Sequence, residues 1–192
     1  MNLELHTERL SLRPFADTDL DLALEMWTDP EVVKYVGEVM TEEGVRMEMP
    51  DSIKRGGNGG IGIWCVADRA TGEKLGDAYL LPRAIDEDDT DFSLVVMGQM
   101  PDADIEVGYF LRPSAWGRGY ATEICKRLLQ FAFQELPLDE VVASVDDGNA
   151  ASQKVLEKSG LINRGRTRSY GKDSPIFRIT REEWNALQHS LK

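Results

Sequence analysis

The chain has 192 residues, of which 42% are hydrophobic, and its formal net charge is -12. A chain of this size buries one sizeable core, so we expect a single domain over residues 1–192. The acidic excess argues against a nucleic-acid surface and favours a cationic or amine substrate. The absence of a leader-like start and of any run near the roughly 20 apolar residues of a membrane span predicts a cytoplasmic protein without a membrane partner.

The N-terminal third predicts one strand followed by helices. Residues 9–15 alternate like an edge strand that Pro14 closes. Asp17 is the expected cap of a helix, because apolar residues recur at helical spacing from Leu20 to Trp27. Asp29 and Pro30 end this helix before a short helical run through Tyr35, and a third helix is expected over residues 41–53.

The middle of the chain predicts a hairpin and then an acidic insertion. Residues 56–60 are a glycine-rich turn, and strands 61–68 and 74–81 flank a second turn at Thr71 and Gly72. Residues 86–91 are almost all acidic and read as a solvated loop. The apolar run 92–97 after them predicts an added edge element. A subunit contact, and with it a homodimer, or a lid over the acceptor site is the alternative.

The second half alternates strands and helices. We expect a strand over 104–111, a helix over 120–136, a strand over 140–145 and a helix over 150–159 that Gly160 ends. Two further strands and a terminal helix follow, and the helix begins with a capping box from Thr180 to Glu183. Trp184 and Leu187 are its expected anchors. The residues of helix 120–136 expected to face the sheet are Ala121, Ile124, Leu128, Ala132 and Leu136.

The two cysteines, Cys65 and Cys125, fall in a strand-like and a helical run without metal-ligand spacing. We therefore expect two core thiols and no metal site. His6 and His189 lie near the two ends of the sequence, which argues against a serine-histidine mechanism.

The turn between strand 104–111 and helix 120–136 predicts an anion site. Gly117 and Gly119 allow several main-chain NH groups to converge on one anion, and the following helix directs its positive end toward the same point. A P-loop would need Lys-Ser/Thr at the end of this turn, and a dinucleotide fingerprint would need glycine where Thr122 stands. Both of these templates fail. Arg112 and Arg118 flank the turn, as phosphate ligands or as solvated side chains.

The residues around this turn resemble the GNAT superfamily of N-acetyltransferases. Trp116 to Ala121 align with the Gln/Arg-x-x-Gly-x-Gly/Ala loop that binds the acetyl-CoA pyrophosphate, with Trp116 in place of the usual Gln or Arg. Glu-Val-Gly-Tyr from Glu106, Asn-Ala-Ala-Ser from Asn149, and the segments 7–14 and 27–32 look like the ribosomal-protein (RimJ/RimL-like) branch. The resemblance therefore spans nearly the whole chain.

This resemblance implies an α/β (α+β, three-layer) GNAT fold. Its sheet is mixed, mostly antiparallel, twisted and flanked by helices, and two parallel central strands splay apart to hold CoA. The resemblance also implies a set of acetyl-CoA-binding residues, partly through their main chain. They are Tyr109, Phe110, Leu111, Trp116, Gly117, Arg118, Gly119, Tyr120, Ala121, Thr122, Asn149 and Ser152. Asn149 has a second interpretation, because asparagine at a helix start is commonly an N-cap.

The implied reaction is acetyl transfer from acetyl-CoA to a primary amine by direct attack, without a metal. The acceptor is a protein N-terminal α-amine or a small-molecule amine, and Trp27 and Tyr35 are expected to wall its site. Glu106 is the candidate base or water-positioning carboxylate; a solvated strand end or an arginine partner is the alternative. Ser152 is the candidate donor to the CoA thiolate, or else bonds the main chain. Leu156 stands where the family often has a tyrosine acid.

Two other functional classes remain open from the sequence alone. The first is a catalytically idle GNAT-fold protein that binds acyl-CoA as a sensor or scaffold. The second is a nucleotide or phosphosugar binder that uses the same loop. Turnover with an amine separates the enzyme from the sensor, and competition by ATP separates it from the nucleotide binder.

Overall fold

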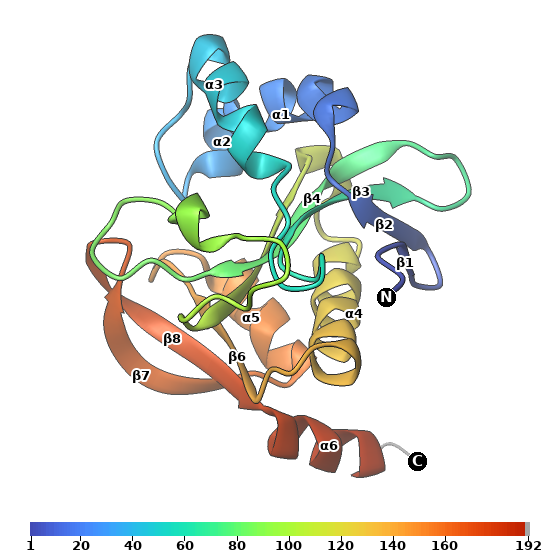
Figure 1. The fold of residues 1–192 in the computed structure, drawn as a ribbon, viewed down its shortest axis with the longest axis vertical. Coiled ribbons are helices and arrows are strands. Elements are labelled where there is room, and N and C mark those ends of the chain that lie inside the picture. The colour runs from blue at the N-terminus through green and yellow to red at the C-terminus, as the bar shows by residue number, and fades with distance from the viewer. Residues whose placement is uncertain (191–192) are drawn as a thin grey trace.

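The computed structural model describes residues 1–190, in which one mixed sheet of eight strands is flanked by helices (Figure 1). The strand order is β1-β2-β3-β4-β5-β6-β8-β7, and every neighbouring pair is antiparallel except β5 and β6. The expected mixed, mostly antiparallel sheet is confirmed. The strands are β1 Leu5–His6, β2 Leu10–Pro14, β3 Gly62–Asp68, β4 Lys74–Pro82, β5 Ile105–Leu111, β6 Glu140–Ser144, β7 Ile162–Ser169 and β8 Lys172–Thr180.

The helices form a layer on each face of the sheet. On β3, Trp64 and Val66 pack into a core cluster with α4 and α5, whereas Ile63 and Cys65 pack into a second cluster with α1 and α3. This alternation is the period of two expected of a strand that is covered on both faces. The helices are α1 Leu20–Trp27, α2 Pro30–Val33, α3 Glu42–Ser52, α4 Tyr120–Glu135, α5 Ala150–Ser159 and α6 Arg181–Ser190.

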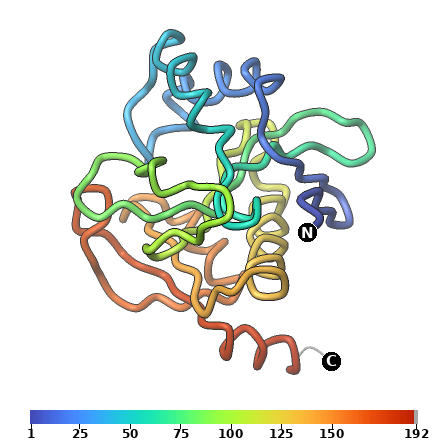
Figure 2. The backbone as a smooth tube through the Cα atoms, viewed as in Figure 1, coloured from blue at the N-terminus to red at the C-terminus, as the bar shows by residue number. Residues whose placement is uncertain are grey.

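The path of the chain separates the N-terminal helices from the C-terminal helix. Figure 2 shows the blue and cyan segment of α1 to α3 gathered at one end of the molecule and the red α6 at the other.

The cysteines lie as expected, because Cys65 and Cys125 are both buried and unpaired. Within residues 1–190, no helix is long and apolar enough to cross a lipid bilayer.

Two details of the N-terminal prediction are wrong. β2 is not an edge strand, since the short β1 pairs with its outer side. Asp17 does not cap α1; it opens a single 3-10 turn, and the side chain that organises this corner is the buried Asp19. Asp19 accepts a hydrogen bond from the Ala16 NH and pairs with Arg13, with an Arg13 Nη2 to Asp19 Oδ1 distance of 2.6 Å.

The short second helix and the third helix each begin at a side-chain cap. The Asp29 side chain accepts from the NH of Glu31 at the start of α2, which ends at Val33, two residues before the expected end at Tyr35. The Thr41 side chain accepts from the NH of Gly44 at the start of α3.

The hairpin of β3 and β4 is confirmed, and the glycine-rich turn before it is tightly packed. A side chain at Gly60 would place its Cβ against a methyl group of Leu136, which would have to shift. The edge element expected over 92–97 is wrong. Asp91 caps a 3-10 turn over Phe92–Leu94, and Val95 is buried in the second core while Met97 stays exposed. The segment therefore crosses the helical layer as a loop.

The regular second half agrees with the prediction. In α4, the residues Ile124, Leu128 and Ala132 are buried against the sheet, and Ala121 is half-buried. The capping box of α6 is present, because the Thr180 NH donates to Glu183 and the Glu183 NH donates to the Thr180 hydroxyl. Trp184 anchors this helix, but Leu187 is 39% exposed and is not a core anchor.

Candidate functional site

The parallel strands β5 and β6 define the site. They pair only where Glu106 faces Val142, although β5 pairs with β4 along its whole length and β6 pairs with β8. Beyond Glu106 the facing sides of the two strands diverge. A cavity of about 500 Å³ lies between them and runs to the turn before α4. The splayed parallel pair expected from the resemblance is therefore confirmed.

The turn before α4 has the geometry of an anion cradle. Gly117 and Gly119 have φ angles of 70° and 80°, and Gly119 is the N-cap residue of α4 without any side-chain cap. Within residues 1–190, no hydrogen-bond acceptor partners the main-chain NH groups of residues 117–122. A Cβ added at Gly117 would meet no atom within 4 Å. Free NH groups at a helix start, next to open space, fit a pyrophosphate.

Cations gather beside this cradle. The guanidinium of Arg118 lies 4.8 Å from the centre of the Tyr120 ring, and that of Arg9 lies 4.5 Å from the same centre. Arg9 is held there by Glu123, whose carboxylate also accepts a hydrogen bond from the Thr7 hydroxyl. These bonds bring the N-terminal motif and the loop motif of the sequence together, and they keep the pKa of Glu123 low despite its partial burial.

Arg112 does not serve the cradle. Its guanidinium is held 2.6 Å from Glu25 Oε2 and donates to the carbonyl of Lys74, so it is neither a phosphate ligand of the cradle nor the solvated side chain of the alternative expectation. Two lysines that the sequence reasoning missed, Lys154 and Lys158, line the cavity from α5. Their spacing of four residues places them on one face of that helix, and this pattern was readable from the sequence.

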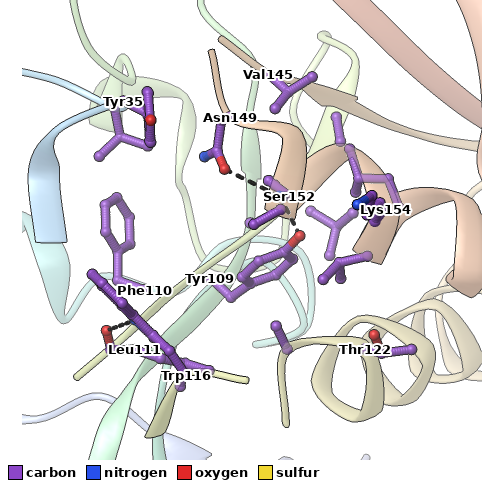
Figure 3. A pocket seen from close by; sticks show the side chains of 18 of the residues that line it. Tyr35, Tyr109, Phe110, Leu111, Trp116, Thr122, Val145, Asn149, Ser152 and Lys154 are labelled. Atoms are coloured by element: carbon purple, nitrogen blue, oxygen red, sulfur yellow. Dashed lines mark hydrogen bonds between the residues drawn. The ribbon is translucent and has the colours of Figure 1, made fainter. Parts of the chain in front are cut away.

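Almost all of the predicted binding residues line the cavity (Figure 3). Trp116 is half-exposed, and its indole Nε1 donates to the carbonyl of Leu111 at 2.7 Å. This bond fixes the turn to the end of β5. Arg118 is the one predicted binding residue outside the lining. The predicted residues that line the cavity are Glu106, Tyr109, Phe110, Leu111, Trp116, Gly117, Gly119, Tyr120, Ala121, Thr122, Asn149 and Ser152.

A pair of hydroxyl groups, one from β5 and one from the start of α5, lies at the site. The Asn149 side-chain oxygen accepts from the NH of Ser152 at 3.1 Å, so Asn149 is an N-cap and keeps its amide NH₂ free. The Ser152 hydroxyl lies 3.0 Å from the hydroxyl of Tyr109 and not on a main-chain carbonyl (Figure 3). Burial raises the pKa of Tyr109, which therefore stays protonated. Leu156, where the family often has a tyrosine, is buried one turn further along.

Glu106 lies at the narrow end of the cavity and is 3% exposed. Its Oε1 accepts from the NH of Ser144 at 2.6 Å, and its Oε2 accepts from the phenol of Tyr170. Burial raises the pKa of Glu106, and the two donors act in the opposite direction. Glu106 is thus neither a solvated strand end nor a partner bound to an arginine.

Glu106 and the hydroxyl pair of Tyr109 and Ser152 lie on opposite faces of β5. Glu106 faces the layer of α1 to α3, together with Tyr79 and Phe110, whereas Tyr109 faces the layer of α4 and α5. Tyr79 also lines the cavity, and its ring lies directly over Gly108. Sequence reasoning missed Tyr79 and Tyr170, because nothing in their local pattern indicates that they meet Glu106.

The two residues expected to wall the acceptor site have different surroundings. Tyr35 lines the cavity. Trp27 does not; it stacks on Phe15, and its Nε1 donates to Asp77 at 3.2 Å. Trp27 therefore packs in the second core. Burial raises the pKa of Asp77 to about 7.

The comparison with protein families decides which of the expected classes applies. The family model described as "Acetyltransferase (GNAT) domain" matches residues 9–162, which include the cradle and both catalytic candidates. The chain belongs to the GNAT acetyltransferase family. It is an acetyl-CoA-dependent acyltransferase with the GNAT fold, as the sequence predicted.

Individual GNAT relatives agree with this assignment. The FsC-acetyl coenzyme A-N(2)-transacetylase of Aspergillus fumigatus is 32% identical over 200 residues, which cover 96% of this chain and 79% of the relative. The crystal structure of a GNAT acetyltransferase from Bacillus anthracis matches in fold, with a TM-score of 0.72, 22% identity, and coverage of 93% of this chain and 99% of that chain. Support for the ribosomal branch is looser. YdaF of Bacillus subtilis, named provisionally as a ribosomal N-acetyltransferase, is 29% identical over 85 residues, 41% of this chain and 46% of its own.

Proposed function

We propose that this GNAT protein transfers the acetyl group of acetyl-CoA to a primary amine by direct attack. The observation that carries the proposal is the cavity between β5 and β6, which joins the anion cradle at Gly119 to the buried carboxylate of Glu106. In this proposal the pyrophosphate binds at residues 117–122 and the pantetheine arm lies along the free edge of β5. The free amide of Asn149 is its side-chain partner, and the cations near the phosphates are Arg118, Arg9, Lys154 and Lys158.

The proposed chemistry gives each buried group a role. The amine nitrogen bonds to the acetyl carbon, and the C–S bond breaks. Glu106 takes the proton that the attacking amine loses, directly or through a water molecule. The departing thiolate receives a hydrogen bond and a proton from the hydroxyl pair of Ser152 and Tyr109, in place of the tyrosine that Leu156 replaces. No covalent acetyl-enzyme forms.

The acceptor must present a neutral amine. At pH 7 a lysine side chain costs roughly 4.6 kcal/mol to deprotonate and an α-amine only about 1 kcal/mol. The buried carboxylate of Glu106, even with its raised pKa, is a weak base that suits the smaller demand, so we propose an α-amine, or a small-molecule amine of similarly low pKa, as the acceptor.

Thiol release with a panel of α-amines and lysine-type amines tests this proposal. Glu106→Gln should lower kcat by roughly 10²-fold and leave the affinity for acetyl-CoA unchanged. A wild-type rate in that variant would remove Glu106 from the mechanism. Tight acetyl-CoA binding without turnover against any amine would instead favour the acyl-CoA sensor.

A further inference from the structure

The turn between β7 and β8 contains a strained aromatic residue. Tyr170 has a φ of 49°, and no other non-glycine residue among residues 1–190 has a positive φ. Gly171 follows with a φ of 67°, so the two residues form the tight turn of the hairpin. Asparagine or glycine adopts this conformation readily, whereas a bulky residue is strained in it. Contacts elsewhere must therefore hold the Tyr170 ring in place.

The first residues of the acidic insertion, which spans residues 83–104, hold the main chain of this turn. The NH groups of Tyr170 and Gly171 donate to the carbonyls of Ala84 and Ile85, at 3.2 and 2.9 Å. The buried Arg83 donates to the Arg168 carbonyl at 2.9 Å and to the Ser169 hydroxyl at 2.7 Å. Figure 1 shows the green insertion beside the end of the β7–β8 hairpin.

Arg83 itself is fixed from the far end of the insertion. Its Nη2 lies 2.7 Å from Asp104 Oδ2, immediately before β5. The two ends of the insertion thus meet at Arg83, and residues 83–85 clamp the hairpin turn through their hydrogen bonds to residues 168–171. A loop that made no such contacts would leave the turn free to relax.

The clamped turn directs the Tyr170 phenol onto Glu106. Tyr170 donates to Oε2, while the Ser144 NH from β6 occupies Oε1. The other ionisable groups that act on this carboxylate are Tyr79 from β4 and Arg83 from the insertion, and Asp89 of the insertion acts on Tyr79. Among residues 1–190, Tyr170 is thus the only ionisable side chain that is hydrogen-bonded to Glu106. Burial raises the pKa of its phenol and keeps it protonated.

We propose that Tyr170 is a positioning residue of the reaction, whose phenol, clamped by residues 83–85, holds Glu106 ionised and oriented toward the amine. This inference rests on the proposed function, in which Glu106 is the base. It also assigns a role to the start of the insertion, because residues 83–85 hold the β7–β8 turn that carries Tyr170.

The pH dependence of kcat/KM tests the role of Tyr170. Tyr170→Phe keeps the ring and removes the donor, so the pKa of Glu106 rises because its charged form loses a hydrogen bond. The acid limb of the profile should move to higher pH by roughly one to two units, with the affinity for acetyl-CoA unchanged. Lys172→Ala changes an exposed side chain that follows the same turn and lies outside the cavity lining, so its acid limb should match that of wild type.

A stronger donor of the same shape gives the opposite sign. Difluorotyrosine at position 170 keeps every packing contact, and it should move the acid limb to lower pH. This variant also serves if Tyr170→Phe fails to fold. An acid limb that stays in place in both Tyr170 variants, or that moves equally in Lys172→Ala, would overturn the proposal for Tyr170. Failure of the proposed function has a different signature, because Glu106→Gln would then keep the wild-type rate and profile.

Discussion

The hydroxyl groups of Tyr109 and Ser152 lie 3.0 Å apart and join β5 to α5 across the floor of the cavity. The two residues are 43 positions apart in the chain, and the Ser152 hydroxyl bonds Tyr109 in place of the main-chain carbonyl that was its alternative partner. The pair lies on the face of β5 opposite to Glu106. This separation suits a reaction that removes a proton on one side of the thioester and returns one on the other.

Removal of either hydroxyl should disable the same proton donor. We expect Tyr109→Phe and Ser152→Ala each to lower kcat by roughly 10- to 100-fold, because the leaving thiolate loses its acid. The kcat of the double variant should be only slightly lower than that of the less active single variant, since the effects of groups that act as a unit are not additive. Thiol release at saturating acetyl-CoA measures all three rates. Rate losses that multiply would show two independent roles.

The cradle predicts a sharp effect at one glycine. Gly119→Val forces a β-branched residue to a φ of 80° and places side-chain atoms where the pyrophosphate approaches, so acetyl-CoA affinity should fall by roughly 100-fold or more. Gly72→Val is the matched control, because Gly72 has a φ of 76°, no atom within 4 Å of an added Cβ, and a place in the distant β3–β4 turn. Calorimetric titration of both variants with acetyl-CoA measures this difference. If Gly119→Val and Gly72→Val bound acetyl-CoA with equal affinity, the phosphates would bind elsewhere.

Lys154 and Lys158 should contribute through charge alone. Each alanine variant is expected to weaken acetyl-CoA binding a few-fold at low salt, and the loss should largely disappear near 1 M salt, where charges on the surface are screened. Lys126→Ala, on the exposed side of α4 and outside the cavity lining, is the control and should bind like wild type. A loss that persists at high salt would point to a contact other than a screened ion pair.

Asp77 predicts a pH dependence of stability. Burial raises its pKa from 3.8 to about 7 in the folded protein, and Trp27 is its hydrogen-bond partner. The folded state thus binds the proton more tightly, so the stability from this group is complete below about pH 4 and is lost as the pH rises through 7. Relative to wild type, Asp77→Asn should gain roughly 2 to 4 kcal/mol of unfolding free energy between pH 4 and pH 8. Urea unfolding at both pH values measures this difference, and a constant difference would show that Asp77 stays ionised.

The parts of the molecule that the sequence predicted well have a local signal. The hairpin of β3 and β4, the helices α3 to α5 and the capping box at Thr180 each follow from periodicity, turn residues or caps within a few positions. The cradle at Gly117 and Gly119 is equally local, since positive φ angles and a helix start follow one another directly.

The parts that the sequence did not predict depend on contacts across the sheet. Nothing near Tyr170 indicates that its phenol reaches Glu106, and nothing near Tyr109 indicates a bond to Ser152. The apolar run at residues 92–97 has the composition of a strand, but the Asp91 cap and the burial of Val95 turn it into a loop. Asp17 was a plausible cap by type, yet Asp19 is the residue that Arg13 binds.

The central claim is that this protein binds acetyl-CoA and acetylates an amine. Two measurements on the wild-type protein test it most directly. The first is calorimetric titration with acetyl-CoA in the absence and presence of ATP, and the second is thiol release with α-amines as acceptors. The account predicts one acetyl-CoA site that ATP displaces poorly, and release of CoA together with an acetylated amine. Binding of acetyl-CoA that ATP abolishes at comparable concentration, or binding without any amine-dependent thiol release, would contradict it.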